Sequence, residues 1–217
     1  AMQCVRRYDW FVKLDMVKYF DSINHDVLRR QLSRIIKDRV LLSTFDRLLD
    51  GYEVQHGCGL PIGNLTSQYF ANHYLAAADH YAKRVLGAPA MIRYMDDVVM
   101  FGNDRANLRQ MMHRYIDFVN ERLCLAVHEP VMNSSSRGLP MLGYVVHRRG
   151  NMRLNGRSRR RFSRAMGAWT TRLERGETTV DDYVTHVTCL LAFVDKADSR
   201  ALKRRLALTT GMYPQGL

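Results

Sequence analysis

A chain of 217 residues, 47% of them hydrophobic, is long enough for one large domain, with or without a small addition, and can bury a sizeable core. Its 33 basic and 21 acidic side chains give a net charge of +12, which favours a polyanionic partner, nucleic acid before a membrane surface. No apolar stretch is long enough to span a bilayer, no signal-peptide pattern opens the chain, and the 4 cysteines lack metal-ligand spacing. These features argue against a membrane protein and a cysteine-based metal centre, and indicate the cytoplasm.

The first part of the chain predicts a strand followed by helices. Trp10–Leu14 is a mostly apolar run that is typical of a buried strand, and it places Asp15 at its end. From Asn24, a good helix cap, apolar residues recur at helical spacing, which predicts a helix over 24–36. The glycine-rich stretch 57–63 predicts a connector, and a second helix is expected over about 65–85.

Two adjacent aspartates follow. Asp96 and Asp97 lie between the apolar runs 91–92 and 98–101, which predicts a hairpin with the acidic pair at its turn. A helix is expected over about 107–122. The apolar run 141–146 is broken by a glycine, so that it predicts either a strand or a tight hairpin.

The composition changes abruptly at residue 147. The stretch 147–164 contains eight arginines and no acidic residue, and residues 183–194 place their apolar side chains on one helix face. We therefore predict a boundary near residue 150, between a mixed body (1–150) and a basic, mainly helical segment (151–217). Because guanidinium groups match phosphate geometry, the arginines are expected to contact a nucleic-acid backbone, with a solvated basic face as the alternative. They are Arg148, Arg149, Arg153, Arg157, Arg159, Arg160, Arg161 and Arg164.

Three aspartates can converge on one edge of a sheet. Asp15 ends the first strand, and Asp96 and Asp97 meet it there if the hairpin is a neighbour in the same sheet. Three ionised carboxylates repel one another and suit two Mg²⁺ ions about 4 Å apart, with open positions for phosphate. Taken singly, each aspartate is equally well explained as a surface turn or a helix cap.

Several segments, in order, resemble the catalytic palm of reverse transcriptases. The run 15–23 (Asp-Met-Val-Lys-Tyr-Phe-Asp-Ser-Ile) resembles the first palm motif, and 59–68 (Gly-Leu-Pro-Ile-Gly-Asn-Leu-Thr-Ser-Gln) resembles the second. Residues 93–97 (Arg-Tyr-Met-Asp-Asp) are similar to the third, and 142–144 (Leu-Gly-Tyr) to the later primer-grip element. The resemblance covers residues 10–146. It implies an α+β palm, with an antiparallel sheet and helices packed on one face, followed by a thumb-like helical segment.

The resemblance implies an RNA-directed DNA polymerase that transfers nucleotides with divalent metal ions. Asp15 and Asp96 would be metal ligands and catalytic residues together with Asp97, on two Mg²⁺ ions or alternatively Mn²⁺. The implied partners are a template RNA, a DNA or RNA primer and deoxynucleoside triphosphates, with no membrane. The implied location is the cytoplasm of a bacterial or phage-infected cell.

Other residues are implied to bind the nucleotide, the primer or the template. Phe20 occupies the family's steric-gate position, where a bulky ring collides with a ribose 2′-hydroxyl, and Gly63 allows close approach of the backbone. Met95 would lie beside the primer end, whereas Tyr144 and Phe162 would either stack on nucleic acid or simply pack. The predicted binding set is Phe20, Ile62, Gly63, Gln68, Met95, Leu142, Gly143, Tyr144, Arg159, Arg160 and Arg161.

The second motif indicates a subgroup. Ile62 stands where many reverse transcriptases have Gln, and Ser67-Gln68 where many have Ser-Pro. This form resembles the enzymes of bacterial and phage diversity-generating retroelements, which implies error-prone copying and a retroelement accessory protein as a further partner. Because Ile62 cannot donate the hydrogen bonds of Gln, control of the incoming nucleotide would be looser. Retron-like and group II intron-like enzymes are the alternatives.

Two departures from the family pattern leave other functions open. Only 14 residues precede Asp15, where the family has a fingers region, so that we expect a truncated chain or fingers supplied by another chain. Between Cys124 and Asn133 there is no lysine to protonate pyrophosphate, and His128 is the nearby candidate acid. The alternatives are a non-catalytic nucleic-acid-binding or assembly module and an RNA-dependent RNA polymerase; Phe20 argues against the latter.

Overall fold

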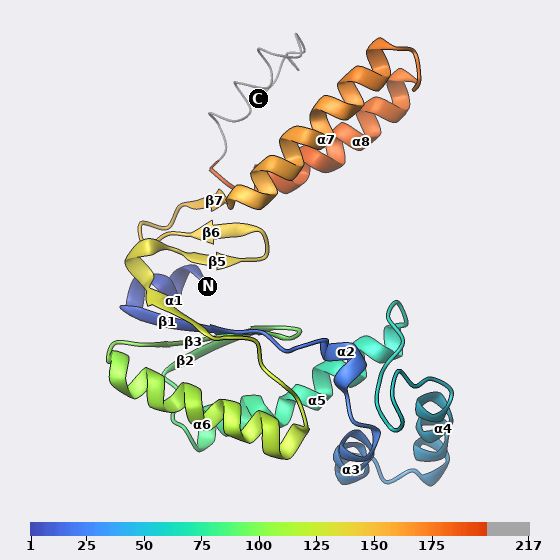
Figure 1. Cartoon of the computed structure of the whole chain (residues 1–217), viewed down its shortest axis with the longest axis vertical. Helices are drawn as coiled ribbons and strands as arrows, with labels where there is room; N and C mark the ends of the chain where they lie inside the picture. Colours follow the sequence, from blue (N-terminus) through green and yellow to red (C-terminus); the bar gives the residue numbers. More distant parts are fainter. Residues whose placement is uncertain (199–217) are drawn as a thin grey trace. The chain divides into compact units, whose positions relative to one another are not determined.

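The chain divides into two compact units. The structure is a computed structural model, and it describes residues 1–198. One unit comprises residues 8–134, and the other comprises residues 1–7 together with the chain from residue 135 onward. Figure 1 traces both units from the N-terminus to the last described helix. Each unit has its own sheet, and each is described by itself.

The unit of residues 8–134 is built on a four-stranded antiparallel sheet with the order β2-β3-β1-β4. The strands are β1 (Trp10–Leu14), β2 (Ala90–Tyr94), β3 (Asp97–Gly102) and β4 (Val131–Ser134). The central strand β3 is covered on both faces, because Val98, Val99, Met100 and Phe101 are all fully buried. A continuous apolar run rich in β-branched residues suits such a position.

Helices cover one face of this sheet. In Figure 1, α5 (Leu65–Arg84) and α6 (Arg105–Leu123) lie on the same side of it, packed against each other, and α6 contacts β1 and β3. The chain leaves β1 through the short α2 (Tyr19–Ser22), α3 (His25–Ile35) and α4 (Arg39–Asp50). Because α3 packs on both α4 and α5, its apolar face joins the same core.

A buried tyrosine ties the helices together inside this core. The side chain of Tyr74, on α5, is fully buried, and its hydroxyl donates to the Leu123 carbonyl at 2.5 Å. The same hydroxyl accepts from the Asn24 backbone N–H at 3.3 Å. Burial raises the pKa of Tyr74, so the hydroxyl remains protonated and available as a donor.

Polar side chains fix where three helices begin. Asn24, Asp38 and Asp104 each accept hydrogen bonds from backbone N–H groups in the first turn of α3, α4 and α6. These caps satisfy amides that have no partner inside a helix. The predicted cap at Asn24 and the predicted helix that follows it are therefore confirmed.

The other unit contains a small sheet and a helical hairpin. Its elements are α1 (Met2–Arg7), η1 (Ser135–Arg137), β5 (Leu139–Met141), β6 (Tyr144–Val146), β7 (Met152–Leu154), α7 (Gly156–Glu174) and α8 (Val180–Asp195). The strands are antiparallel in the order β5-β6-β7. The helices α7 and α8 lie side by side (Figure 1) around a core of Phe162, Met166 and Val194.

Most of the predicted elements are confirmed. The class is α+β, with an antiparallel sheet and helices on one face, and the run 141–146 is the turn and second strand of a tight hairpin. The helix α4 was not predicted. In the segment expected to be mainly helical, the sequence did not predict the strand β7 or the separate bounds of α7. The boundary at residue 150 stays a prediction, and residues 199–217 of the segment 151–217 lie outside the described part. Among the described residues, no helix combines the length and apolarity that a membrane crossing requires.

Candidate active site

The register of the larger sheet brings the first and third motifs to one edge. Leu14 of β1 pairs with Val98 of β3 in an antiparallel ladder. Asp15 follows directly on the first of these strands, and Asp97 begins the second. The two carboxylates therefore leave the sheet at the same edge, as the sequence predicted if the hairpin was a neighbour of the first strand.

The third aspartate lies in the turn of the adjoining hairpin. Tyr94 of β2 pairs with Asp97 of β3, so that Met95 and Asp96 form a two-residue turn. Met95 has a φ of 55°, in the left-handed region that short hairpin turns require and that side chains other than Gly, Asn and Asp seldom adopt. The pairing of β2 with β3 therefore fixes the position of the Asp96 backbone.

The charges at this edge interact. Partial burial raises the pKa of Asp96, and repulsion from Asp15 and Asp97 raises it further. A backbone hydrogen bond and the ammonium group of Lys13 oppose these effects, but the net direction is upward. Lys13 Nζ lies 2.8 Å from Asp97 Oδ1. The three aspartates and Lys13 thus form one electrostatic cluster.

This cluster is a partial rather than a complete metal cage. Within residues 1–198, no group of three or more His, Cys, Asp or Glu side chains is arranged to hold a metal ion. Asp97 is engaged by Lys13, whereas Asp15 and Asp96 form no ion pair among the described residues. A divalent cation would replace the repulsion between these two carboxylates by attraction. The pair fits Mg²⁺, which is commonly held by one or two carboxylates, with water and phosphate completing its shell.

Arg93 anchors the turn to α5. Its guanidinium group donates to the Asp79 carboxylate at 2.7 Å and to the Asn72 side-chain oxygen at 3.1 Å. It also donates to the carbonyl oxygen of Met95 at 2.9 Å. Burial is the largest single effect on the pKa of Arg93 and lowers it, but the hydrogen bonds and the charge of Asp79, with smaller contributions from nearby tyrosines, together raise it. The motif contained Arg93, yet its partner lies on a helix 14 residues earlier, so local spacing gave no signal of this role.

Phe20 lies beside the loop of the second motif. Its ring is half-buried and stands edge-on to the ring of Tyr19, with centroids 5.8 Å apart and planes at 71°. Its carbonyl accepts from the Leu60 N–H at 2.9 Å. Tyr19 is buried and donates to the Ala71 carbonyl at 2.5 Å. The ring of Phe20 is therefore partly buried against the core, with Tyr19 as its aromatic neighbour.

Other predicted residues of the second motif are on the surface. The Ile62 side chain is 79% exposed, and Gln68 is exposed on the first turn of α5. Gly63 has a φ of 104°, which an L side chain rarely adopts, and a Cβ there would meet no atom within 4 Å. Glycine is thus required at this position by the backbone conformation and not by crowding.

The remaining predicted residues belong to the other compact unit. Leu142 and Gly143 form the turn of the β5–β6 hairpin with φ values of 51° and 87°, and a Cβ at Gly143 would lie 3.0 Å from the Phe193 ring. Tyr144 is 8% exposed and donates to the Phe193 carbonyl at 2.7 Å. Phe162 is 3% exposed. In the structure both side chains pack within their own unit, and the role of Tyr144 in binding stays a prediction.

The predicted arginine cluster begins helix α7. Arg157, Arg159, Arg160, Arg161 and Arg164 are all exposed. Arg157, Arg160 and Arg164 follow the three-to-four-residue spacing that places side chains on one helix face, with Arg161 beside them. The first turn of α7 has no acidic residue. Between residues 1 and 198, no ion pair to any of these five arginines is found.

His128, the candidate acid, adjoins Asp15 through the main chain. Its backbone N–H donates to the Asp15 carbonyl at 2.9 Å, and its side chain is exposed. The isolated bridge between Met16 and Val127 continues the same antiparallel contact. Sequence alone identified His128 only by elimination, whereas the structure brings it next to an aspartate of the cluster.

The sequence matches a protein family and, over part of its length, several known proteins. Residues 1–130 match the family described as "Reverse transcriptase (RNA-dependent DNA polymerase)". The COX1/OXI3 intron 1 and intron 2 proteins of Saccharomyces cerevisiae are each 32% identical over 80 residues, which is 34% of this chain and 10% and 9% of theirs. The chain therefore spans about a tenth of the curated relatives it matches.

Solved telomerase structures have a similar fold. Apo telomerase of Candida tropicalis, truncated from the C-terminal domain, has a TM-score of 0.55 at 15% identity, over 67% of this chain and 35% of the telomerase. Telomerases of Candida tropicalis and Candida albicans, each in complex with a TWJ fragment of telomeric RNA, have TM-scores of 0.56 and 0.54 at 10% and 14% identity. These two matches cover 92% and 96% of this chain and 40% and 41% of the telomerases. At such identities the likeness shows the fold alone.

We predict that Arg93→Ala lowers the free energy of unfolding by about 2–3 kcal/mol, because it leaves the Asp79 carboxylate and the Met95 carbonyl without their shared donor. Urea unfolding followed by circular dichroism measures the change. Arg109→Ala, on the exposed side of α6, is the control and should change the value by less than about 0.5 kcal/mol. Equal effects of the two substitutions would contradict the anchoring role of Arg93.

Proposed function

The chain belongs to the reverse transcriptase (RNA-dependent DNA polymerase) family, and from this premise we propose that it forms the palm of an RNA-directed DNA polymerase. The proposed reaction is nucleotidyl transfer, in which a primer 3′-hydroxyl attacks the α-phosphate of a deoxynucleoside triphosphate and pyrophosphate leaves. The observation that carries the proposal is the meeting of Asp15, Asp96 and Asp97 at one sheet edge. They meet at the positions that the family's first and third motifs assign to its catalytic carboxylates.

We propose Asp15 and Asp96 as the metal-binding carboxylates. Two Mg²⁺ ions, or Mn²⁺ in their place, would neutralise phosphate charge and lower the pKa of the attacking hydroxyl when bound. Lys13 keeps Asp97 at the same edge while it reduces the repulsion that Asp97 exerts on Asp96. The repulsion that remains between Asp15 and Asp96 favours the binding of a cation by this carboxylate pair.

Two further groups of the chain have proposed roles at this edge. Arg93 fixes the carbonyl of the turn, so that Asp96 keeps its orientation toward Asp15. His128, whose backbone is bonded to that of Asp15, is the proposed proton donor to the leaving pyrophosphate. It would replace the lysine that the family has in this region.

Phe20 is proposed as the gate against ribonucleotides. The backbone of Phe20 is linked to the loop that carries Ile62 and Gly63 through the Leu60 N–H, and its ring is only partly buried. Contact with Tyr19 prevents the ring from turning aside when a ribose 2′-hydroxyl approaches. A gate of this kind favours synthesis of DNA and argues against an RNA polymerase.

The proposed partners are a template RNA, a DNA or RNA primer and deoxynucleoside triphosphates. Two of the similar telomerase structures contain a fragment of telomeric RNA, which supports RNA as the template. Leu142, Gly143, Met95 and Gln68 remain candidates for contact with the primer or the nucleotide. An accessory protein and a chain bearing fingers are further proposed partners.

The start of α7 is proposed as a second contact with nucleic acid. Arginines in the first turn face the positive end of the helix dipole, and those three or four residues apart also repel one another. Both effects lower helix stability, and both reverse when phosphates approach. Because phosphate contacts carry no sequence information, the contact is expected to be salt-sensitive and nonspecific.

We further propose a retroelement enzyme of bacterial or phage type, acting in the cytoplasm, closest to the diversity-generating retroelements. The support is the second motif, where exposed Ile62 replaces the amide side chain found in many reverse transcriptases. The alternative is an enzyme of the group II intron type, which the similarity to the two yeast intron proteins supports.

Asp96→Asn is expected to abolish primer extension on an RNA template, with a loss of at least about 100-fold. The assay uses the complete polymerase that contains these residues, with Mg²⁺ and labelled primer. Asp117→Asn, on the exposed face of α6, is the control and should extend normally. Extension by the Asp96→Asn variant at the rate of the unsubstituted protein would refute the catalytic assignment and favour a non-catalytic module.

A stability measurement tests the metal site without any activity. In the isolated chain, Asp96→Asn should raise the thermal midpoint in the absence of divalent metal, because it removes repulsion. It should also abolish the rise in midpoint that Mg²⁺ causes in the unsubstituted chain. A Mg²⁺ response that survives this substitution would rule out Asp96 as a ligand.

Phe20→Ala is expected to lower the preference for deoxynucleotides over ribonucleotides by about tenfold or more, because the ring no longer meets the 2′-hydroxyl. The ratio of kcat/KM for dNTP and rNTP measures this preference. Phe20→Tyr keeps the bulk and serves as the control. An unchanged ratio in the alanine variant would mean that Phe20 is only a core residue.

A combined Arg157→Gln, Arg160→Gln and Arg164→Gln variant should weaken binding of every nucleic-acid sequence to a similar extent. The slope of log K against log salt should fall by about 2–3. Fluorescence anisotropy with two unrelated oligonucleotides measures both effects, and the matched lysine variant should keep most of the slope. Loss of affinity for one sequence alone would contradict a backbone contact.

A further inference from the structure

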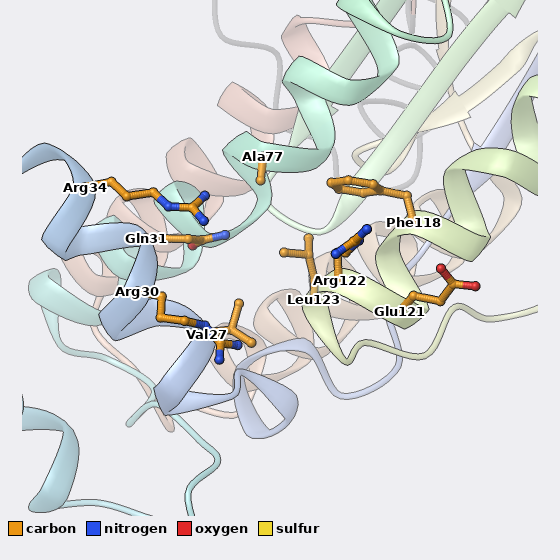
Figure 2. Close-up of a pocket in the computed structure, with 9 residues that line it drawn as sticks. All are labelled: Val27, Arg30, Gln31, Arg34, Ala77, Phe118, Glu121, Arg122 and Leu123. Carbon is orange, nitrogen blue, oxygen red and sulfur yellow. The ribbon is translucent and has the colours of Figure 1, made fainter.

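A pocket of about 470 Å³ lies among three helices of the unit of residues 8–134. Its walls come from α3, α5 and the end of α6, and Figure 2 shows their side chains. None of the residues predicted for catalysis or substrate binding lines it. The volume falls in the range of small-ligand pockets. The lining residues are Val27, Arg30, Gln31, Arg34, Ala77, Phe118, Glu121, Arg122 and Leu123.

Three arginines with no carboxylate partner border this pocket. Arg30 and Arg34 project from α3 and Arg122 from α6, and within the described chain none of them forms an ion pair. By contrast, the adjacent Arg29 is bonded to three aspartates on α3 and α4. Glu121 is the one acidic side chain in the lining, so positive charge predominates. Unneutralised guanidinium groups at a recess suit a phosphate.

The pocket also presents a flat aromatic surface. Phe118 stacks on Tyr81 with centroids 4.2 Å apart and planes at 9°, which covers one face of its ring and fixes the ring's orientation. The same residue lines the pocket, opposite the side chains of α3 in Figure 2. A nucleobase that enters can stack on this ring, because every base has an aromatic face.

An unsatisfied acceptor lies on the opposite wall. Gln31 Nε2 donates to the Tyr74 carbonyl at 3.1 Å, which fixes the orientation of the amide. Gln31 Oε1 is shielded from solvent and has no hydrogen-bond partner in the described structure. A buried acceptor without a donor is unfavourable. An N–H or O–H group of a ligand can remove this penalty only after the Gln31 amide turns toward the pocket, because Oε1 is shielded in the structure.

We infer that this pocket binds a nucleotide, with its phosphate on Arg30, Arg34 and Arg122 and its base on Phe118. The nucleotide can be free or can belong to a single strand that passes the helices. The inference depends on the pocket alone, and it holds whether or not the proposed polymerase activity does.

Binding by the complete chain tests this site. The probes are inorganic phosphate, adenosine monophosphate, an adenine tetranucleotide and an abasic tetranucleotide of the same length, each titrated by calorimetry. The double variant Arg34→Gln/Arg122→Gln should weaken binding of the adenine probes about fivefold or more. Arg84→Gln/Arg109→Gln removes the same charge outside the pocket from exposed positions and should change affinity by less than about twofold.

A second variant tests the aromatic wall. Phe118→Leu should weaken binding of both adenine probes about fivefold or more and leave the abasic tetranucleotide unchanged. A larger loss of affinity for the tetranucleotide identifies a single strand as the natural ligand, and a larger loss for adenosine monophosphate identifies a free nucleotide. Either result supports the site. Equal losses in the pocket and control pairs would overturn it. Phosphate that binds as tightly as adenosine monophosphate, with no effect of Phe118→Leu, would also overturn it.

Discussion

Repulsion among carboxylates at one sheet edge is the constraint on which the unit of residues 8–134 depends. Asp15, Asp96 and Asp97 end or join the strands β1, β2 and β3, so the fold cannot form without bringing their charges together. The chain tolerates this repulsion because cations oppose it. Lys13 neutralises Asp97 directly, and Arg93 ties the turn to α5 through Asp79. The compensation is partial, and the residual charge is the basis of the metal binding proposed for this edge.

Sequence reasoning succeeded where the determining interactions are local. The strand at 10–14, the cap at Asn24 and the acidic hairpin follow from periodicity, a single capping side chain and a short turn, and each was predicted. The anchoring role of Arg93 and the pocket around Gln31 were not predicted, because the residues that contact them are distant in the sequence. In the same way, Tyr144 and Phe162 could not be assigned to core or surface until α7 and α8 were seen to pack on each other.

The two nucleic-acid contacts proposed for this chain use positive charge differently. On α7 the arginines stand on an exposed helix face, where they can follow a backbone of any sequence. At the pocket of α3, α5 and α6 they surround a recess whose wall contains the Phe118 ring, and this ring is proposed to distinguish a base from a bare phosphate. Net charge alone predicted a polyanionic partner but could not separate these two kinds of surface.

The backbone at Met95 has a consequence for engineering. Its φ of 55° is adopted more easily by glycine or asparagine, and holding a longer side chain there lowers stability by about 1 kcal/mol. Selection for heat resistance alone would therefore drive this position toward glycine or asparagine and remove the thioether from the turn that carries Asp96. Libraries designed to stabilise the chain should keep residue 95 fixed, because at this position the most stable sequence and the functional one are expected to differ.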